Sequence, residues 1–346
     1  MAAVLNPRLV LSSRPTGYPI AGKDITYDTT RTIDPTTVEL NGGFLTKTLW
    51  LSLDPYLRGR MDDPKLKTYY APQWALGDTL DNTGIAVVVR SDVPALPAGA
   101  HVMGFLPFEA YTLHPASSAD GFQVIENKEG VPLSTYLGVL GMPGETGWYG
   151  LEEYGECKPG ESIYVSTGAG QVGSVVCQLA KAKGLRVIAS TGSAEKVAFL
   201  ESLGVDRAFN YKTSSVAEEL KEFGGIDIYW DNVGGQMLET AIENMKPFGR
   251  LILCGIGSEY NTEEKYGVKN LDRVVYWRLK MVGFVVPELR PKYADAFYAT
   301  APGMVARGEL KYSEEVVEGL ERVGDAFAGM LQGRNLGKVV VRVAQP

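Results

Sequence analysis

The sequence predicts an α/β protein with a parallel, doubly wound sheet, joined to a smaller β-rich domain that forms a barrel or sandwich. From about Leu137 onward, short apolar runs alternate with amphipathic helical segments, a pattern typical of parallel sheets. Before that point, short apolar runs alternate with glycine and proline turns, and no segment has a convincing helical period until about Ser134. The length of 346 residues exceeds what most single cores bury, so we expect two domains.

The β-rich domain covers residues 1–136. Its apolar runs "FLTKTLWLSL" and "GIAVVVR" are typical of strands, and "LPAGAHVMGF" predicts a turn that leads into another short strand. The second domain covers residues 137–314 and begins its sheet with the strand "SIYVST". The helix that follows places four apolar residues on one face and ends at Gly184; these residues are Val172, Val175, Val176 and Leu179.

The remaining segments of the second domain repeat the same alternation. "LRVIAS" predicts a strand, and "SAEKVAFLESLG" predicts a helix with Ser193 as its N-cap and Gly204 at its end. Later strands are expected in "IDIYWDNVGG", "GRLILCGIGSEYN" and "KMVGFVV", the last of them at the edge of the sheet. The C-terminal stretch "VVEGLERVGDAFAGMLQGRNLGKVVVRV" predicts a helix, a glycine loop and a strand.

Composition excludes several classes of function. The formal net charge is −7 and no run of Lys and Arg stands out, which argues against nucleic-acid binding. No stretch of about 18 apolar residues is present to span a membrane, and the N-terminal segment does not resemble a signal peptide. We therefore expect a cytoplasmic protein. The three cysteines and two histidines are scattered and form no CxxC pair, so we expect no metal site.

A glycine motif indicates a dinucleotide site. Gly168, Gly170 and Gly173 form G-x-G-x-x-G between a predicted strand and a predicted helix, which is the context that the motif requires. The first glycine allows a tight turn, the second lets the backbone approach a pyrophosphate, and the third lets helix and strand pack closely. The N–H groups of the helix start, at Gln171 and Val172, then face the anion. The alternative is a purely structural tight turn.

The end of the second strand favours NADPH over NADH. An NAD site usually carries Asp or Glu there, but this strand ends in Ser-Thr-Gly-Ser, with Gly192 and Ser193 in the turn. Lys196 follows on the next helix, and Tyr211 and Lys212 follow the next strand. A cation and hydroxyl donors suit a 2′-phosphate. The alternative for Lys196 is an ordinary solvated lysine. The loops Asp231–Gly235 and Cys254–Tyr260 each follow a strand and should border the cofactor.

With these residues in hand, the chain resembles the zinc-independent medium-chain dehydrogenases/reductases, and within them the leukotriene B4 12-hydroxydehydrogenase, prostaglandin reductase and alkenal double-bond reductase branch. The matching stretches extend over almost the whole chain in order, and the Gly-His-Glu signature of zinc-binding relatives is absent where this chain has "LDNTGIAVV". The stretches are "LSLDPYLRGRM", "GVLGMPGETGWYGL", "GAGQVGSVVCQLAKAKG", "GSAEKVAFLESLGVDRAFNYK", "DNVGG", "CGIGSEYN" and "GRNLGKVVV".

The resemblance implies a GroES-like β-barrel catalytic domain, to which residues 315–346 return, and a Rossmann domain that binds NADPH in the cleft. It implies that Lys196 and Tyr211 hold the 2′-phosphate. It places further residues near the cofactor, namely Met142, Thr146, Asn232, Cys254, Ile256 and Asn335. The chain departs from its relatives at four positions: Gly168 and the polar Gln171 in the turn, Glu145 in place of an apolar residue, and Trp148 in place of a tyrosine or similar residue.

The implied reaction is reduction of the carbon–carbon double bond of α,β-unsaturated aldehydes and ketones. Hydride from NADPH adds to the β-carbon, and the oxygen of the resulting enolate needs a donor. We assign Tyr260 to that role, with the nicotinamide ribose hydroxyl as helper; the alternative for Tyr260 is that it only orients the ribose or packs. Tyr56 is the second candidate, with structural packing as its alternative. An NADPH quinone reductase and a non-catalytic nucleotide-binding protein remain the rival functions. The predicted edge strand leads us to expect a homodimer.

Overall fold

The computed structural model describes residues 3–65 and 71–345. These residues form two compact units, which we describe separately. Unit 1 comprises Met1–Leu137, Glu314–Asn335 and Val339–Pro346, and unit 2 comprises Gly138–Ser313 and Leu336–Lys338.

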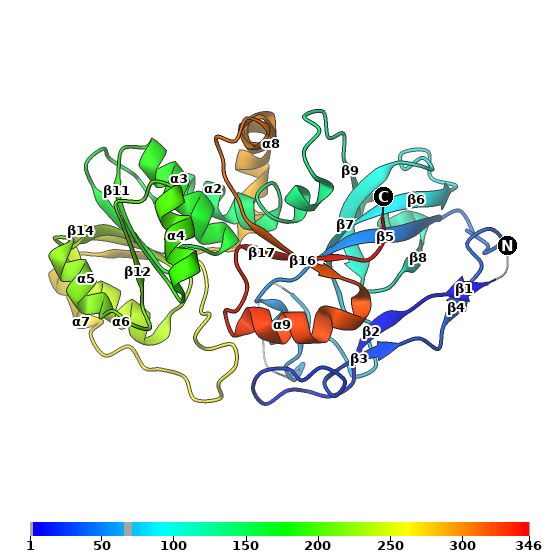
Figure 1. Cartoon of the computed structure of the whole chain (residues 1–346), viewed down its shortest axis with the longest axis horizontal. Helices are drawn as coiled ribbons and strands as arrows, with labels where there is room; N and C mark the ends of the chain where they lie inside the picture. Colours follow the sequence, from blue (N-terminus) through cyan, green and yellow to red (C-terminus); the bar gives the residue numbers. More distant parts are fainter. Residues whose placement is uncertain (1–2, 66–70, 346) are drawn as a thin grey trace. The chain divides into compact units, whose positions relative to one another are not determined.

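Unit 2 is built on a six-stranded sheet in the order β12-β11-β10-β13-β14-β15, in which every neighbouring pair is parallel. Figure 1 labels β11, β12 and β14 of this sheet. Side chains alternate between the faces of a strand, and nearly all those of the central strands are buried, so both faces are covered. The parallel, doubly wound sheet predicted from the sequence is confirmed. The strands are β10 Ser162–Val165, β11 Arg186–Thr191, β12 Arg207–Asn210, β13 Ile226–Asp231, β14 Met245–Leu253 and β15 Lys280–Gly283.

Two helices of unit 2, α3 and α4, end at the glycines that the sequence predicted, and α4 begins at its predicted N-cap. Ser193 accepts a hydrogen bond from the Lys196 N–H at the start of α4, and Gly184 and Gly204 have positive φ just beyond α3 and α4. β15 lies at the edge of the sheet, as expected from "KMVGFVV". The helices are α2 Met142–Tyr154, α3 Gln171–Ala182, α4 Ala194–Ser202, α5 Val216–Glu222, α6 Gly235–Glu243, α7 Asp272–Tyr276 and α8 Arg290–Ala306, with a 3-10 turn η3 at Val286–Glu288.

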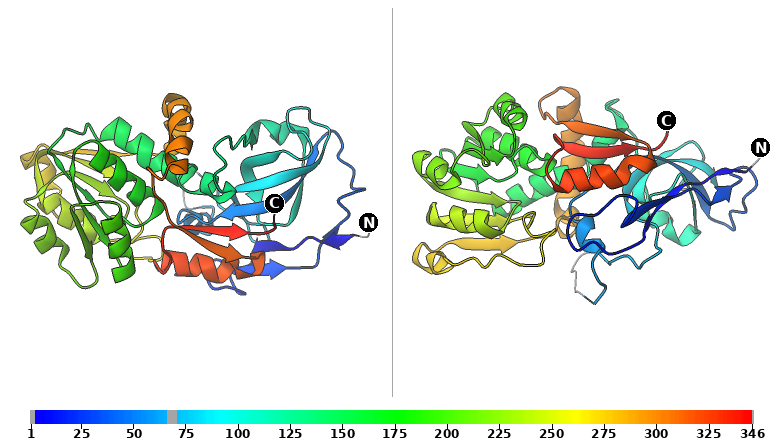
Figure 2. Two further views of the ribbon diagram at one scale, coloured as in Figure 1. Left: turned by 45° about the horizontal axis from the view of Figure 1, so that its top comes forward. Right: turned by 60° about the horizontal axis from the view of Figure 1, so that its bottom comes forward.

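Unit 1 contains a separate seven-stranded sheet in the order β16-β17-β5-β6-β7-β9, with β8 also paired to β5. The long strand β5 pairs with β8 at its start and with β17 at its end, so its neighbour on that side changes along its length. Figure 2 shows the C-terminal strands, in red, beside the blue ones of this sheet. The main strands are β5 Phe44–Ser52, β6 Asp81–Ser91, β7 His101–Pro107, β8 Tyr111–His114, β9 Gln123–Val124, β16 Glu314–Glu318 and β17 Lys338–Arg342.

Two small sheets and several short helices complete unit 1. The strand pairs are β1 Val4–Leu5 with β4 Thr32–Ile33, and β2 Arg8–Leu11 with β3 Ile25–Asp28. The helices are α1 Leu57–Arg60 and α9 Val323–Leu331, and the 3-10 turns are η1 Ala116–Gly121, η2 Leu133–Leu137 and η4 Leu320–Arg322.

Two local predictions were wrong. The one-turn helix α1 interrupts the segment in which we expected no helix. The predicted helix beginning at "VVEGL" is instead strand β16 up to Glu318, because these residues add an edge strand beside β17; Gly319, with φ +83°, then turns the chain toward α9.

Candidate cofactor and active site

The glycine turn lies between β10 and α3, at the carboxyl edge of the unit 2 sheet. Its left-handed residue is Thr167, with φ +52°, and not Gly168. Gly168 is needed for space, because a Cβ there would lie 2.8 Å from the Ala189 Cβ. A Cβ on Gly173 would lie 2.5 Å from the Thr167 carbonyl oxygen, so only glycine lets α3 approach the turn so closely.

The start of α3 has the features of a ligand site. Gly170 is the N-cap and has no side chain with which to satisfy the first N–H groups of this 12-residue helix. Next to it, Gln171 is only 5% exposed, and neither its Oε1 nor its Nε2 makes a hydrogen bond in the described part of the chain. A buried amide without partners is costly, so the turn is built to receive a polar group that bonds to it. The pyrophosphate of a dinucleotide fits this arrangement.

A second cradle lies where β11 and β12 end. A Cβ placed on Gly192 would stand 3.3 Å from both the Tyr211 Oη and the Lys212 Cε, so these two side chains converge over the glycine. Ser193 and Lys196 occupy the first turn of α4 beside it. The strand ends in Ser190 and Thr191, which are buried and carry no charge. A lysine, a tyrosine hydroxyl and a helix start suit a 2′-phosphate.

Two loops are joined at the carboxyl ends of β13 and β14. The N–H groups of Cys254 and Gly255 donate to the Asp231 carbonyl oxygen at 2.9 and 3.0 Å, and the Gly257 N–H donates to that of Asn232 at 3.1 Å. A Cβ on Gly234 would lie 3.3 Å from Ile256, so the loops are also in close contact. Both loops therefore border the same edge as the glycine turn.

Asp231 and Asn232 hold this edge together. The Asp231 carboxylate accepts from the N–H groups of Val233 and Gly234, each at 2.8 Å, and burial raises the pKa of its carboxyl group. The Asn232 Nδ2 donates to the Ser166 carbonyl oxygen at 2.6 Å, which links the loop to the end of β10. Burial also raises the pKa of the Cys254 thiol to about 12, so this group is neutral.

Helix α2 carries two further candidates. Thr146 is buried and its Oγ1 donates to the Met142 carbonyl oxygen at 2.6 Å. Next to it, a Cβ on Gly147 would lie 3.0 Å from the Val172 carbonyl oxygen, so α2 packs directly against the first turn of α3. Met142 and Thr146 thus lie on a helix that contacts the start of α3.

The two tyrosine candidates lie in different units. Tyr260, partly buried, lies in the turn that follows β14 in unit 2. Tyr56 precedes α1 in unit 1, and its hydroxyl donates to the Asn82 Oδ1 at 2.6 Å. Asn335 belongs to unit 1, in the loop between α9 and β17. The structure therefore brings together the candidates of unit 2 along one sheet edge, while Tyr56 and Asn335 stand on the other unit.

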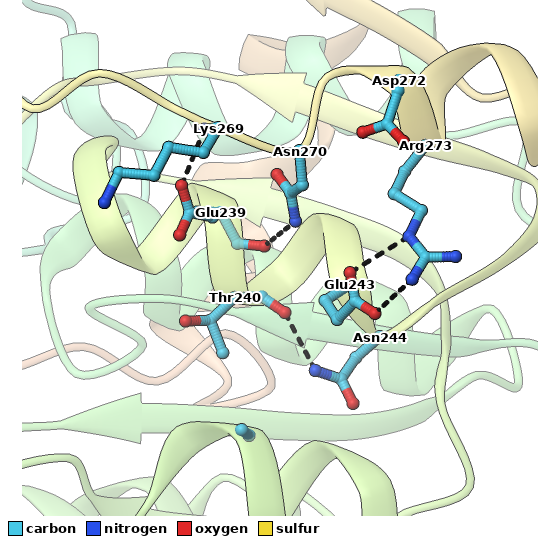
Figure 3. A pocket seen from close by; sticks show the side chains of 9 residues that line it. Glu239, Thr240, Glu243, Asn244, Lys269, Asn270, Asp272 and Arg273 are labelled. Carbon is cyan, nitrogen blue, oxygen red and sulfur yellow. Dashed lines mark hydrogen bonds and ion pairs between the residues drawn. The ribbon is translucent and has the colours of Figure 1, made fainter.

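A cavity elsewhere on unit 2 is not this site. It is lined by the last turns of α6 and by the segment before and within α7 (Figure 3). Two of its carboxylates are bonded within it: Glu243 pairs with Arg273, and Glu239 accepts from the backbone N–H of Lys269. α6 begins at the carboxyl edge of the sheet, so its last turns lie away from that edge.

The potential metal ligands are dispersed. Across residues 3–65 and 71–345, no group of three or more His, Cys, Asp or Glu side chains is arranged to hold a metal ion. His114 is buried, stacks on Phe44 and contacts the Thr46 hydroxyl, and burial lowers its pKa to about 4. Within the same part of the chain, no helix combines the length and the apolar character needed to cross a bilayer.

Sequence reasoning missed two contributors to the site. Thr167 carries the left-handed turn, and Ser166 accepts hydrogen bonds from both the backbone and the side chain of Asn232. Both depend on backbone geometry that has no local signature. Lys212, which the sequence placed beside Tyr211 after a predicted strand, joins the cradle at Gly192.

Comparisons with known proteins agree with this architecture. Residues 172–300 match the family described as zinc-binding dehydrogenase, and residues 8–124 match the N-terminal domain of oxidoreductase. The chain is 38% identical over 349 residues to the NADP(+)-dependent 2-alkenal reductase of Nicotiana tabacum, covering 99% of this chain and 98% of that protein. It is 40% identical over 308 residues to prostaglandin reductase 1 of Rattus norvegicus, covering 87% of this chain and 90% of that protein.

A solved structure extends the likeness to three dimensions. CurA from Vibrio vulnificus in complex with NADPH superimposes with a TM-score of 0.87 and 32% identity, covering 98% of this chain and all of that one. These matches span both units of the fold. The chain therefore belongs to the medium-chain dehydrogenase/reductase family, in its zinc-independent branch with the alkenal and prostaglandin reductases.

Proposed function

We propose that this enzyme reduces the carbon–carbon double bond of α,β-unsaturated aldehydes and ketones with NADPH. The observation that carries the proposal is the cradle over Gly192, where the Tyr211 hydroxyl and Lys212 converge and no carboxylate follows the strand until the exposed Glu195. A carboxylate at the strand end would favour the ribose diol of NADH, whereas this cradle suits a 2′-phosphate. The names of the alkenal and prostaglandin reductases support the choice of substrate class.

The cofactor contacts divide by the part of NADPH that they would hold. Lys196, Tyr211, Gly192 and Ser193 would hold the 2′-phosphate. The glycine turn, with Gln171 and Val172, would hold the pyrophosphate. The nicotinamide half would lie against α2 and the paired loops, at Met142, Thr146, Asn232, Cys254 and Ile256, and Asn335 would contact the cofactor from unit 1.

The chemistry needs a hydrogen-bond donor for the substrate carbonyl. NADPH, when bound, supplies the hydride that adds to the β-carbon. Negative charge then develops on the carbonyl oxygen, and a positioned hydroxyl stabilises it. We assign Tyr260 to that oxygen. Tyr56 is the second candidate, and its hydroxyl would first have to give up the bond that it donates to Asn82. The Asn82 side chain is buried, and it is held in turn by Ser52 and Asp54.

The test is an NADPH-consumption screen of the purified protein against enals, enones, quinones and alcohols, with NADH in parallel. We expect turnover of enals and enones with NADPH and little with NADH. Faster turnover of quinones would favour the quinone reductase. Binding of NADPH without turnover of any substrate would favour a nucleotide-binding protein, and either result would contradict the proposal.

A further inference from the structure

Glu145 is a buried carboxylate in the first turn of α2. It is only 2% exposed, and it stands between Met142 and Thr146, the two residues of this helix assigned to the nicotinamide half. Burying a charge this deeply is costly unless the charge is paired and hydrogen-bonded. The charge must be explained by what it binds.

Helix α8 supplies both partners of this carboxylate, and α2 and α8 lie in contact within unit 2. The Arg290 Nε and Nη2 donate to the Glu145 Oε2 at 2.8 and 2.7 Å. The Tyr298 hydroxyl donates to the Glu145 Oε1 at 2.9 Å. Burial, together with the Glu145 charge, raises the pKa of Tyr298, so its hydroxyl remains a donor. Both carboxylate oxygens are therefore occupied from α8.

Aromatic contacts also hold the two helices together. Trp148 packs edge-on against Phe297 with ring centroids 5.5 Å apart, and Tyr149 stacks on Tyr293 at 5.6 Å. The ion pair itself contributes little to stability, because the Arg290 side chain is 48% exposed and solvent screens its charge. Charged hydrogen bonds of fixed geometry do contribute direction, since they specify how one helix is rotated and shifted along the other.

The orientation of α2 against α8 matters because the other side of α2 contacts the start of α3, next to the glycine turn. Gly147 lies against the Val172 carbonyl oxygen of α3, and Thr146 is tied to Met142 by its own hydroxyl. The first turn of α2 is thus held on one side by the start of α3 and on the other by Arg290 and Tyr298.

We infer that Glu145 is a positioning residue, which fixes the first turn of α2 through Arg290 and Tyr298 so that Met142 and Thr146 meet the nicotinamide half of NADPH. The inference rests on the proposed function. It extends the site to α8, whose residues do not belong to the glycine turn, the cradle or the paired loops.

The chain offers a matched control on the same pair of helices. Glu153, two turns further along α2, accepts from the Tyr293 hydroxyl and the Lys292 ammonium of α8, both at 2.5 Å. Glu153→Gln therefore removes a similar charge from the same helix pair without touching the first turn. Glu145→Gln keeps the shape of the side chain and removes the charge that Arg290 binds.

The experiment compares two ligands by titration calorimetry: NADPH, and adenosine 2′,5′-bisphosphate, which lacks the nicotinamide half. We expect Glu145→Gln to lower the affinity for NADPH about tenfold and to leave the affinity for the bisphosphate unchanged. The loss of a charged hydrogen bond has an effect of this size. Glu153→Gln should change neither affinity. The inference would be overturned if Glu145→Gln lowered both affinities equally or changed neither. It would also be overturned if Glu153→Gln lowered the NADPH affinity by the same factor.

Tyr298→Phe gives a second test if Glu145→Gln fails to fold. This substitution removes one hydroxyl and should lower the affinity for NADPH by a smaller factor, about threefold, without changing the affinity for the bisphosphate. An unchanged NADPH affinity would count against the inference. A wild-type protein that binds NADPH but reduces no enone would contradict the proposed function alone, since the ratio of the two affinities still reports on Glu145. A wild-type protein that does not bind NADPH would overturn both.

Discussion

The Tyr56 hydroxyl donates to the Asn82 Oδ1 at 2.6 Å, and the Asn82 Nδ2 donates onward to the Asp54 carboxylate at 2.9 Å. The proton of Tyr56 is therefore committed to a buried amide before any substrate arrives. To donate to a carbonyl oxygen, Tyr56 would first have to give up this bond. That cost counts against Tyr56 as the donor to a substrate carbonyl.

Tyr260→Phe should accordingly reduce the rate of a single turnover with an enal by about tenfold. The loss stays below the hundredfold that removal of an oxyanion donor can cost, because the ribose hydroxyl remains as a second donor. NADPH affinity should change little, since the charge develops only in the transition state. Rapid-mixing kinetics, with NADPH titrated separately, measures both. Tyr56→Phe serves as the control and should lower the rate less. The reverse order would reassign the donor to Tyr56.

Lys196→Ala should raise the Michaelis constant for NADPH by about ten- to a hundredfold and that for NADH little. The charge-assisted contact with a 2′-phosphate is worth about 1.5–3 kcal/mol, and NADH lacks this phosphate. Steady-state kinetics with both cofactors measures the effect. Lys183→Ala is a suitable control, because Lys183 lies at the C-terminal end of α3 and pairs with Glu152. Equal effects of Lys196→Ala on both cofactors would contradict the assignment.

His114 should make stability depend on pH. Burial lowers its pKa from the ordinary histidine value of 6.5 to about 4 in the folded chain, so the unfolded chain binds a proton first as pH falls. Its contribution is fully present above pH 6.5, declines as pH falls below that value, and is lost by about pH 4. The full loss is about 3 kcal/mol.

Urea unfolding at about pH 7 and about pH 5 measures this contribution. His114→Phe should flatten the dependence, because the ring that stacks on Phe44 is kept and the titrating group is removed. Other titrating groups are common to both proteins, so the difference between them isolates His114. Parallel pH profiles for the two proteins would show that His114 does not titrate in this way.

We predict a homodimer formed through the free edge of β15. α7, just before this strand, exposes Val275 and Tyr276, which are 73% and 66% exposed. Pairing with a second copy would cover both the edge and these side chains. Light scattering at micromolar concentration should give twice the chain mass, and Val275→Glu should shift the protein toward monomer. Val316→Glu, on the edge strand β16 of the other sheet, should leave the mass unchanged. A monomeric wild type would contradict the prediction.

The sequence predicted what depends on local pattern. Ser193, Gly184 and Gly204 mark helix ends because capping needs only neighbouring residues, and the strand–glycine–helix motif marked the turn at Gly168. The strand β16 was missed because its partner is β17, some twenty residues further along the chain. The contact between Glu145 and Arg290 joins residues 145 positions apart, and no periodicity reports it. Thr167 in the left-handed conformation was likewise invisible, since threonine has no preference for it.

The place of β17 in the unit 1 sheet has a consequence for biosynthesis. β17 lies between β16 and β5, so β5 lacks one of its neighbours until residues 338–342 have left the ribosome. Residues 138–313 of unit 2 are translated before that point, and domains made early can fold while synthesis continues. The first unit to begin synthesis is thus the last to complete its sheet. Until then the apolar side chains of β5 have to be protected from other chains. A chain cut short after residue 313 would contain all six strands of the unit 2 sheet but would lack β16 and β17 of the unit 1 sheet.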